Sequence, residues 1–446
     1  MLATPHRLIV DGGTIATLGE PGRVLEGHAL VIEGERIAAI VPSAEADRAG
    51  AEVVDAAGTL VLPGFINAHM HFYSTLVRGL GKAEPSASFQ EVLEHLWWRL
   101  DRQLTLEDCY ISALVALLQA IRHGTTTLID HHASPRAVRG SLPAIARAVR
   151  ECGLRASLCY EVSDRDGEAV AREGIEENAA WIRECAAAGD DQLTALFGLH
   201  ASFTISDRTL EAAARAGHEL GAGFHVHTAE AASDQEACLR EHGCRVVERF
   251  DRAGLLGEKT VCAHGVHLSE RELEILAERR AAIVHNPQSN MNNAVGVADV
   301  PAMLKAGVLV GLGTDAMTTD MLEELRAALW VRHLAAGNPS TGFAETVGLL
   351  LTGNARIAGR HWRVPLGVLA PGAAADVVLV DYHPPTPLDE STLWGHLVFG
   401  VSQSQVDTTI CRGRVLMRGK RLCLDIDEAA VAARARELAA ALWRRF

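Results

Sequence analysis

Histidines and carboxylates recur along this chain in places where they could bind a metal ion. His69 and His71 flank one methionine in "NAHMH" (67–71), directly after an apolar run. The chain has 20 histidines in 446 residues, so a single His-x-His pair can easily arise by chance, and "FHVH" (224–227) contains a second pair. Whether either pair does chemistry depends on the elements that position it.

The middle of the chain alternates short apolar runs with helical patterns. Runs that are apolar on both faces suit buried parallel strands, and segments such as "SERELEILAERR" have helical spacing. Eight strand–helix units over about 300 residues favour an α/β fold of the (β/α)8 TIM barrel type. An open doubly wound sheet is the alternative, but it usually has a Gly-rich phosphate turn after its first strand, and none follows here. The runs cover residues 59–71, 125–132, 155–162, 193–201, 223–230, 260–266, 281–287 and 309–316.

Polar residues stand at the end of nearly every run. In a barrel the C-terminal ends of the strands meet at one mouth, where active sites are built. Residues that are distant in sequence should therefore converge in space. These strand-end residues are His69, His71, Asp130, His131, His132, Glu161, His200, His227, Glu230, His264, His285, Asn286 and Asp315.

The spacing along the strands selects a set of metal ligands. Side chains two apart on a strand share a face, so His69 and His71 can bind one ion. The same rule pairs His225 with His227. We choose His227 as the ligand because it lies nearer the mouth, with His225 one layer deeper as a hydrogen-bonded support. With Asp315 these residues make a nitrogen and oxygen site without thiolate, which favours one catalytic Zn²⁺, although Fe²⁺, Mn²⁺ or Co²⁺ also accept such ligands.

Two residues near this set could move protons. A bound divalent ion would make hydroxide available near neutral pH. Glu230 follows His227 by three residues, close enough to take a proton from that water and pass it to a substrate. The alternative for Glu230 is a carboxylate at the start of a helix. His264 could orient the water or polarise the attacked atom, and its alternative is a structural histidine.

Several nearby residues keep two interpretations. Arg78 either hydrogen-bonds an acceptor-rich ring or is a solvated loop arginine. His131 and His132 face opposite sides of a strand, so at most one of them lines a pocket. Trp97 and Trp98 are expected to pack a helix against the barrel rather than to stack on substrate.

The two chain ends share a sequence pattern that differs from that of the middle. Residues 1–60 and 365–425 carry strand signals broken by Gly turns. We expect them to form one small β-sandwich together, and two independent β-caps are the alternative. The predicted domains are therefore a first sandwich part at 1–60, the barrel at 61–364, and a second sandwich part with a C-terminal amphipathic helix at 365–446.

Composition narrows the partners and the compartment. The net charge of -14 argues against a nucleic-acid surface and gives no support for binding anionic membranes. No apolar run approaches the length of a membrane span, and the N-terminus lacks the pattern of a signal peptide. The nine cysteines have no CxxC spacing, which fits reduced thiols and predicts a cytoplasmic location.

Taken together, the motifs resemble those of the amidohydrolase superfamily, in the branch of cytosine, guanine and related deaminases with chlorohydrolases. Within that branch, "HFYSTLVRGL" and "IDHHASP" are similar to the SsnA-type aminohydrolases and in part to the 8-oxoguanine deaminases. The matching segments are "PGFINAHMH", "GTTTLID", "GLHASFTIS", "HVHTAE", "AHGVHL", "HNPQSNMNN", "GLGTDA" and "GVLAPGAAADVVLVD".

The resemblance implies roles that agree with the spacing. Glu230 would shuttle protons, His264 would assist the water, Asp315 would also accept a proton, and His200 would contact substrate. No lysine ends the fourth run, so the carboxylated-lysine bridge of two-metal relatives is missing and a single metal is favoured. The implied metal ligands are His69, His71, His227 and Asp315.

These observations favour a metal-dependent hydrolytic deaminase that releases ammonia from a purine- or pterin-like heterocycle. Hydrolysis of a cyclic amide or a ring C–Cl bond at the same mononuclear site is the alternative reaction. A non-catalytic binding barrel is the alternative of another class. The expected partner is a small heterocyclic substrate, without nucleic acid or membrane, and a homodimer is expected by analogy with similar barrels.

Overall fold

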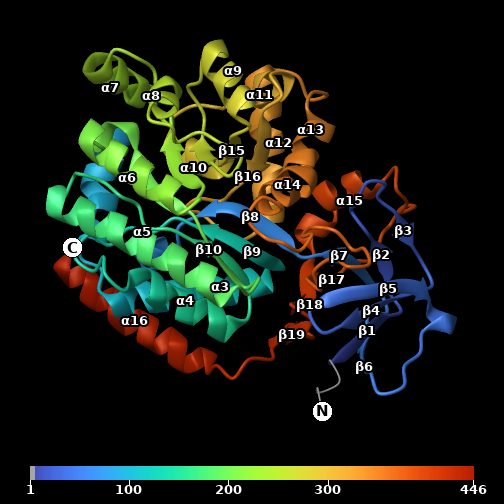
Figure 1. The fold of residues 1–446 in the computed structure, drawn as a ribbon. Helices are drawn as coiled ribbons and strands as arrows, with labels where there is room; N and C mark the ends of the chain where they lie inside the picture. The colour runs from blue at the N-terminus through green and yellow to red at the C-terminus, as the bar shows by residue number, and fades with distance from the viewer. Residues whose placement is uncertain (1–5) are drawn as a thin grey trace.

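The computed structural model describes residues 6–446 and places an α/β barrel beside a β-sandwich (Figure 1). Every barrel strand lies inside one of the eight predicted apolar runs, and adjacent strands pair in parallel. The barrel strands are β8 (Phe65–Met70), β9 (Thr125–Asp130), β10 (Arg155–Leu158), β12 (Phe197–Ala201), β13 (Phe224–Thr228), β14 (Val261–His264), β15 (Ala282–His285) and β16 (Leu309–Leu312).

Two seams close these strands into a ring. The first four-stranded sheet has the order β11-β10-β9-β8, with β11 at Leu193–Ala195, and the second runs from β12 to β16. At one seam Met70 bridges Asp315 in parallel, and at the other Val162 bridges Leu199. The N–H of Asp315 also donates to the carbonyl of His69 at 3.0 Å. The predicted (β/α)8 barrel is therefore confirmed.

Helices cover the outside of the barrel, and their ends follow ordinary capping chemistry. Thr105 and Asp108 cap the first turn of α3 reciprocally, which satisfies two backbone N–H groups that lack helical partners. The helix α4 stops at Gly153, whose φ of 78° suits glycine. The longer helices are α3 (Leu106–Arg122), α4 (Ser141–Cys152), α5 (Glu168–Ala188), α6 (Asp207–Glu219), α7 (Ala232–His242), α9 (Glu270–Arg279) and α12 (Met321–Ala336).

The sandwich is built from strands of both chain ends. Its sheets have the orders β5-β4-β1-β6 and β20-β19-β18-β17-β7-β2-β3. The strand β7 (Thr59–Pro63) pairs antiparallel with β17 (Val377–Asp381), so the predicted boundary at residue 60 falls inside a sandwich strand. The other strands are β1 (Arg7–Asp11), β2 (Thr14–Ala16), β3 (Val24–Leu25), β4 (His28–Glu33), β5 (Arg36–Pro42), β6 (Glu52–Asp55), β18 (Gln405–Cys411), β19 (Arg414–Arg418) and β20 (Arg421–Leu422).

A buried ion pair joins the sandwich to the base of the barrel. Arg155, the first residue of β10, donates from Nε to Asp376 Oδ2 at 2.8 Å. Their side chains are 1% and 4% exposed. Two charges that leave water together depend on each other, because removal of either one leaves the other buried and unpaired.

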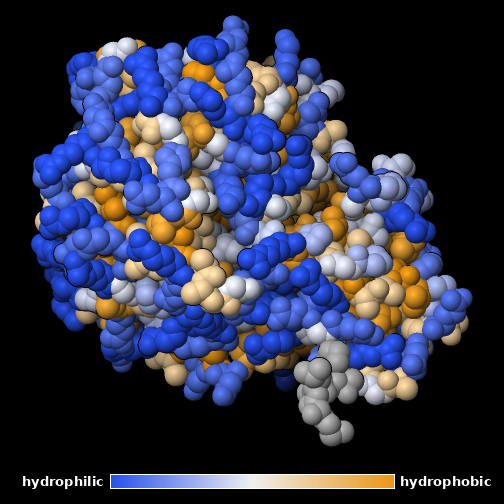
Figure 2. Space-filling model, viewed as in Figure 1, coloured by the Kyte–Doolittle hydropathy of each residue, from blue (hydrophilic) through white to orange (hydrophobic). Residues whose placement is uncertain are grey.

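The C-terminal helix α16 (Glu428–Arg445) leaves the sandwich and lies along α3 of the barrel (Figure 1). Trp443 near its end donates from Nε1 to the carbonyl of Leu76 at 2.8 Å. Figure 2 shows that hydrophilic side chains cover much of the face in view, with hydrophobic patches on the sandwich.

Within residues 6–446, no single helix is both long and apolar enough to span a membrane. One sharply bent pair, Phe89–Asp101 with Leu106–Arg122, meets that test only when its two helices are counted together.

Candidate active site

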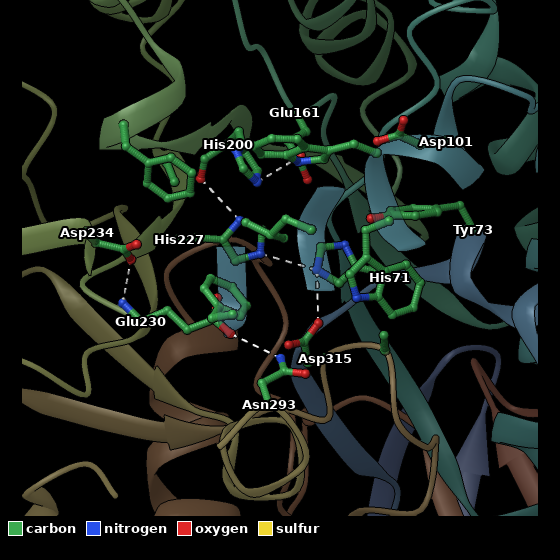
Figure 3. A pocket seen from close by; sticks show the side chains of 17 residues that line it. His71, Tyr73, Asp101, Glu161, His200, His227, Glu230, Asp234, Asn293 and Asp315 are labelled. Atoms are coloured by element: carbon green, nitrogen blue, oxygen red, sulfur yellow. Dashed lines mark hydrogen bonds and ion pairs between the residues drawn. The ribbon is translucent and has the colours of Figure 1, made fainter. Parts of the chain in front are cut away.

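The C-terminal ends of the barrel strands surround a small cavity. Beneath it, His69 and His264 are fully buried. The predicted site residues that line the cavity are His71, His200, His227, Glu230 and Asp315 (Figure 3).

Three imidazole rings turn the same nitrogen toward a common point. Each of these rings uses Nδ1 for a contact with a neighbour. A backbone carbonyl only accepts, so Nδ1 of His71 and of His227 must donate, which leaves the lone pair on Nε2. The Nδ1 contacts are His69 with His225 Nε2 (2.8 Å), His71 with His131 O (2.5 Å) and His227 with His200 O (3.1 Å).

The Nε2 of His71 lies at the spacing of ligands around one ion from both His227 and Asp315, and the Nε2 of His69 lies farther out. The Nε2 atoms of His71 and His227 are 3.2 Å apart, and His71 Nε2 is 3.1 Å from Asp315 Oδ1. His69 Nε2 is 4.0 Å from the same oxygen and has no hydrogen-bond partner among residues 6–446. Tetrahedral zinc bound at about 2.1 Å separates its ligands by about 3.4 Å. The residues present therefore fit one divalent metal ion.

His225 supports a ligand from below. It is fully buried, its Nε2 faces His69, and its Nδ1 lies 3.7 Å from Cys159 Sγ. With His225 as acceptor, the Nδ1 of His69 carries the proton and its Nε2 is free. This arrangement holds the His69 ring in the orientation that metal binding requires.

Protonation at this centre follows burial and charge. Burial, together with the neighbouring histidines, lowers the pKa of His69 and of His227, which keeps them in the neutral form that binds metals. For His71, burial lowers the pKa, but the hydrogen bond and charge of Asp315 outweigh it and raise the pKa to about 9. A metal ion and a proton would therefore compete for His71 Nε2.

Glu230 and His264 stand beside the ligand set. His264 Nε2 is 3.4 Å from Glu230 Oε2 and 3.7 Å from Asp315 Oδ2. Burial, followed by the charges of Asp315 and Asp234, raises the pKa of Glu230 well above its usual value. A carboxyl group with a raised pKa can hold a proton near neutral pH and give it to a substrate.

A short helix after β15, α10 (Pro287–Asn292), and the residue that follows it position these catalytic candidates. Ser289 donates to Asp315 Oδ2, and Asn290 Oδ1 faces His264 Nδ1 at 2.9 Å. Asn293 donates to Glu230 Oε1 at 3.3 Å. The sequence motif "HNPQSNMNN" contained these residues, but their roles depend on contacts across the barrel that the motif does not encode.

The backbone at this centre is unusual in two places. His264 and Asp315 have φ angles of 74° and 52°, in the left-handed region that residues other than glycine rarely adopt. Such conformations persist where the surrounding structure holds them, and they cluster at functional sites.

Arg78 does not line the cavity, which goes against its predicted substrate contact and favours the alternative, a solvated loop arginine. Its side chain is exposed and donates to Gln119 Oε1 at 2.8 Å, outside the cavity. It follows the 3-10 helix η2 (Phe72–Val77), which begins directly after His71. Of the adjacent histidines, His131 faces the barrel interior, and the Nε2 of His132 points to Ser134 on the outer side.

Residues that received no role from the sequence form the rest of the cavity wall. Trp97 and Trp98 line the cavity, which corrects the expectation that they only pack a helix. They belong to a segment that folds over the mouth, made of α1 (Phe89–Val92), the π-helix η3 (Leu93–Trp97) and α2 (Trp98–Asp101). The remaining unassigned wall residues include Tyr73, Phe89, Leu93, Asp101, Glu161, Phe203 and Asn293.

The sequence profile of the amidohydrolase family matches residues 60–416. The chain belongs to the amidohydrolase family. This amidohydrolase is 33% identical to the 5-methylthioadenosine/S-adenosylhomocysteine deaminase of Pelotomaculum thermopropionicum, over 98% of this chain and 99% of that protein. The family relationship that the motifs indicated is confirmed.

Solved structures agree with this fold. An adenosine deaminase from Xanthomonas campestris with bound zinc is 25% identical, with a TM-score of 0.86 over 98% of this chain and 99% of that one. The atrazine chlorohydrolase of Arthrobacter aurescens TC1, complexed with zinc, has a TM-score of 0.81 over 97% and 100% of the two chains. At 22% identity the second likeness shows the fold alone.

Proposed function

We propose that this amidohydrolase is a metal-dependent hydrolytic deaminase that releases ammonia from an amino-substituted, purine- or pterin-like heterocycle. The observation that carries the proposal is the buried Glu230 carboxyl group, 3.4 Å from His264 Nε2 and beside Asp315 at the cavity wall. The deaminase relatives, which align with the chain over nearly its full length, support the same reaction.

The metal would be held by four side chains of the barrel mouth. When bound, the ion supplies Lewis acidity, which lowers the pKa of water toward neutrality. Zinc is the proposed ion, because the donors are imidazole nitrogens and a carboxylate, without thiolate. The ligands are His69, His71, His227 and Asp315.

The protein side chains would manage the protons of the reaction. Glu230 takes one proton from the attacking water and delivers it to a ring nitrogen of the substrate. His264 Nε2, whose lone pair faces Glu230, orients the water, and Asp315 accepts the second proton. The water oxygen bonds to the ring carbon, and the C–N bond breaks. Asp315 passes the second proton to the amino group, which leaves as ammonia, while the ring nitrogen keeps the proton that Glu230 delivered.

Replacement of Glu230 tests this assignment. In zinc-loaded protein, Glu230→Gln should keep its metal and lose about 10²- to 10⁴-fold in ammonia release, the usual contribution of a positioned acid or base. Glu236→Gln, an exposed change on the same side of the barrel, serves as the control. Full ammonia release by Glu230→Gln would contradict the mechanism.

The choice of substrate separates the alternative reactions. A panel of guanine, 8-oxoguanine, pterin, cytosine and triazines should yield ammonia from at least one compound. Chloride or an opened ring as the product would point instead to C–Cl or cyclic amide hydrolysis at the same site. Protein that purifies without stoichiometric metal and releases no product would favour a binding barrel.

We further propose a cytoplasmic location and a homodimeric state for the enzyme. All nine cysteines are free, which suits a reducing cytoplasm. A homodimer is proposed because barrels of this type often pair, and light scattering on the purified protein tests it.

A further inference from the structure

Glu161 is a buried carboxylate that the mechanism above does not use. It follows β10 at the seam of the barrel, where its N–H donates to the carbonyl of His132 at 2.7 Å. Its side chain is only 4% exposed, and what is exposed faces the cavity. In Figure 3, Glu161 lies beside His200, and Asp315 lies on the other side of the pair formed by His71 and His227.

One neighbour of this carboxylate, His131, turns a lone pair toward it. The Nδ1 of His131 is 3.3 Å from Glu161 Oε2 and has no hydrogen-bond partner among residues 6–446. The Nε2 of the same ring contacts the carbonyl of His225 at 3.2 Å. Since a carbonyl only accepts, Nε2 carries the ring proton, and Nδ1 of the neutral ring is an acceptor.

The second neighbour, His200, also turns a ring nitrogen toward Glu161, from the other side of the carboxylate. Its Nε2 is 3.5 Å from Glu161 Oε1. Its Nδ1 contacts Thr204 Oγ1 at 2.6 Å, and the hydroxyl of Thr204 donates to the carbonyl of Ala201 at 3.1 Å. With the hydroxyl proton of Thr204 given to Ala201, Nδ1 of His200 donates to Thr204 and its Nε2 presents a lone pair to Glu161.

These contacts make one wall of the cavity a surface of acceptors. Within residues 6–446, the carboxylate of Glu161 accepts no hydrogen bond that satisfies distance and angle. Arg165, the nearby cation, is paired with the buried Asp101. A buried carboxylate without donors is costly, and a ligand that brings N–H groups removes that cost.

We propose that Glu161 contacts the substrate and accepts its N–H groups, so that the enzyme selects lactam- or guanidine-type heterocycles over adenine-type ones. The inference rests on the proposed deaminase function and names its substrate class. Guanine and pterin carry a ring N–H beside an amino group, two parallel donors that match the two oxygens of a carboxylate. The six-membered ring of adenine presents lone pairs at its ring nitrogens, which would face the acceptors of Glu161 and His131.

A second metal ion is the competing occupant of this wall. The ligand atoms of His71, His131, Glu161 and His227 lie within 4.8 Å of one another. However, His71 and His227 each have one free nitrogen, which the first ion uses. Two ligands then remain, fewer than the three that catalytic zinc sites take from the protein.

The test compares wild type with Glu161→Gln, which keeps the shape but replaces one acceptor by a donor. Glu168→Gln, whose side chain is 75% exposed on α5, is the matched control. The probes are xanthine, which carries N–H groups but no amino group to lose, and guanine, pterin, adenine and 5′-deoxyadenosine. Metal content, calorimetric xanthine binding and ammonia release are measured on zinc-loaded protein.

We expect one equivalent of metal in all three proteins. In Glu161→Gln, xanthine affinity and kcat/KM for guanine or pterin should fall by about 10- to 100-fold, the effect of one hydrogen bond to a charged group. For adenine and 5′-deoxyadenosine, kcat/KM should be the same in the variant as in wild type.

Three results would overturn the proposal. The first is equal xanthine affinity in wild type and Glu161→Gln. The second is two equivalents of metal in wild type but one in the variant. The third, measured on wild type alone, is tighter binding of adenine than of xanthine. If xanthine binding depends on Glu161 but no compound releases ammonia, the deaminase function fails and the role of Glu161 stands.

Discussion

Replacement of His225 by phenylalanine should weaken metal binding without touching a proposed ligand. The Nδ1–H of His69 donates to His225 Nε2 at 2.8 Å, and both residues are fully buried. Phenylalanine fills the same place but offers no acceptor. In the His225→Phe variant a buried N–H therefore loses its partner, and the His69 ring loses the contact that aims its Nε2.

Two estimates of the effect agree. A buried donor left without a partner costs about 1 to 3 kcal/mol, and because about 1.4 kcal/mol corresponds to tenfold, affinity should fall by about 5- to 150-fold. Loss of the partner that orients a metal-binding histidine typically weakens binding by about 10- to 100-fold. We therefore expect zinc affinity to fall by about 10- to 100-fold.

Competition with a chelator of known zinc affinity at neutral pH measures this change. His225→Gln should recover much of the affinity, since its amide oxygen can accept from His69. His132→Phe removes another fully buried histidine that faces away from the centre and should bind zinc as wild type does. Unchanged affinity in His225→Phe, with an unchanged melting temperature, would refute the reasoning.

Three further predictions concern the frame around the site. In Gly313→Ala the new Cβ would lie 2.7 Å from the carbonyl oxygen of His69 and 2.8 Å from its Cβ, so we expect metal analysis to show less than one equivalent; full occupancy would contradict this. Asp376→Ala should lower the free energy of unfolding in urea by about 3 to 5 kcal/mol because it leaves Arg155 buried and unpaired; a loss below about 1 kcal/mol would argue against the pair. Burial raises the pKa of Asp101 to about 6, against the opposing charge of its arginine partner. Because folding favours the protonated form of Asp101, wild type should become less stable relative to Asp101→Asn as the pH rises from about 4 to about 6. Urea titrations measure both free energies of unfolding, and a gain in the stability of wild type relative to the variant over this range would show the opposite linkage.

Much of the barrel could be predicted because its signals are local. A strand buried on both faces needs a continuous apolar run, and a helix that covers it needs apolar residues at helical spacing. Each run therefore predicted its own strand independently of the other runs. The side chains that end the runs, among them His227 and Asp315, then followed from the rule that parallel strands of a barrel finish at one mouth.

The limits of that reasoning appear where a segment leaves its strand. Arg78 and Trp98 both lie between β8 and α3. The sequence left a substrate contact open for Arg78 and expected Trp98 to pack a helix, whereas Arg78 lies outside the cavity and Trp98 lines it. No periodicity encodes the path of this segment, because contacts with α3 and with α16 decide where it lies. The same holds for Asn290 and Asn293, whose partners come from other strands.

By itself, the sequence determined the barrel, the strand ends that meet at its mouth, and a histidine and carboxylate set suited to one metal. Its alternation of side chains also showed that His131 and His132 must face opposite ways. Only the tertiary structure decided that His131 faces inward, because that depends on how the strands close into a ring. Closure likewise brought Glu161 between His131 and His200, since residues from three different strands become neighbours only when the barrel is complete.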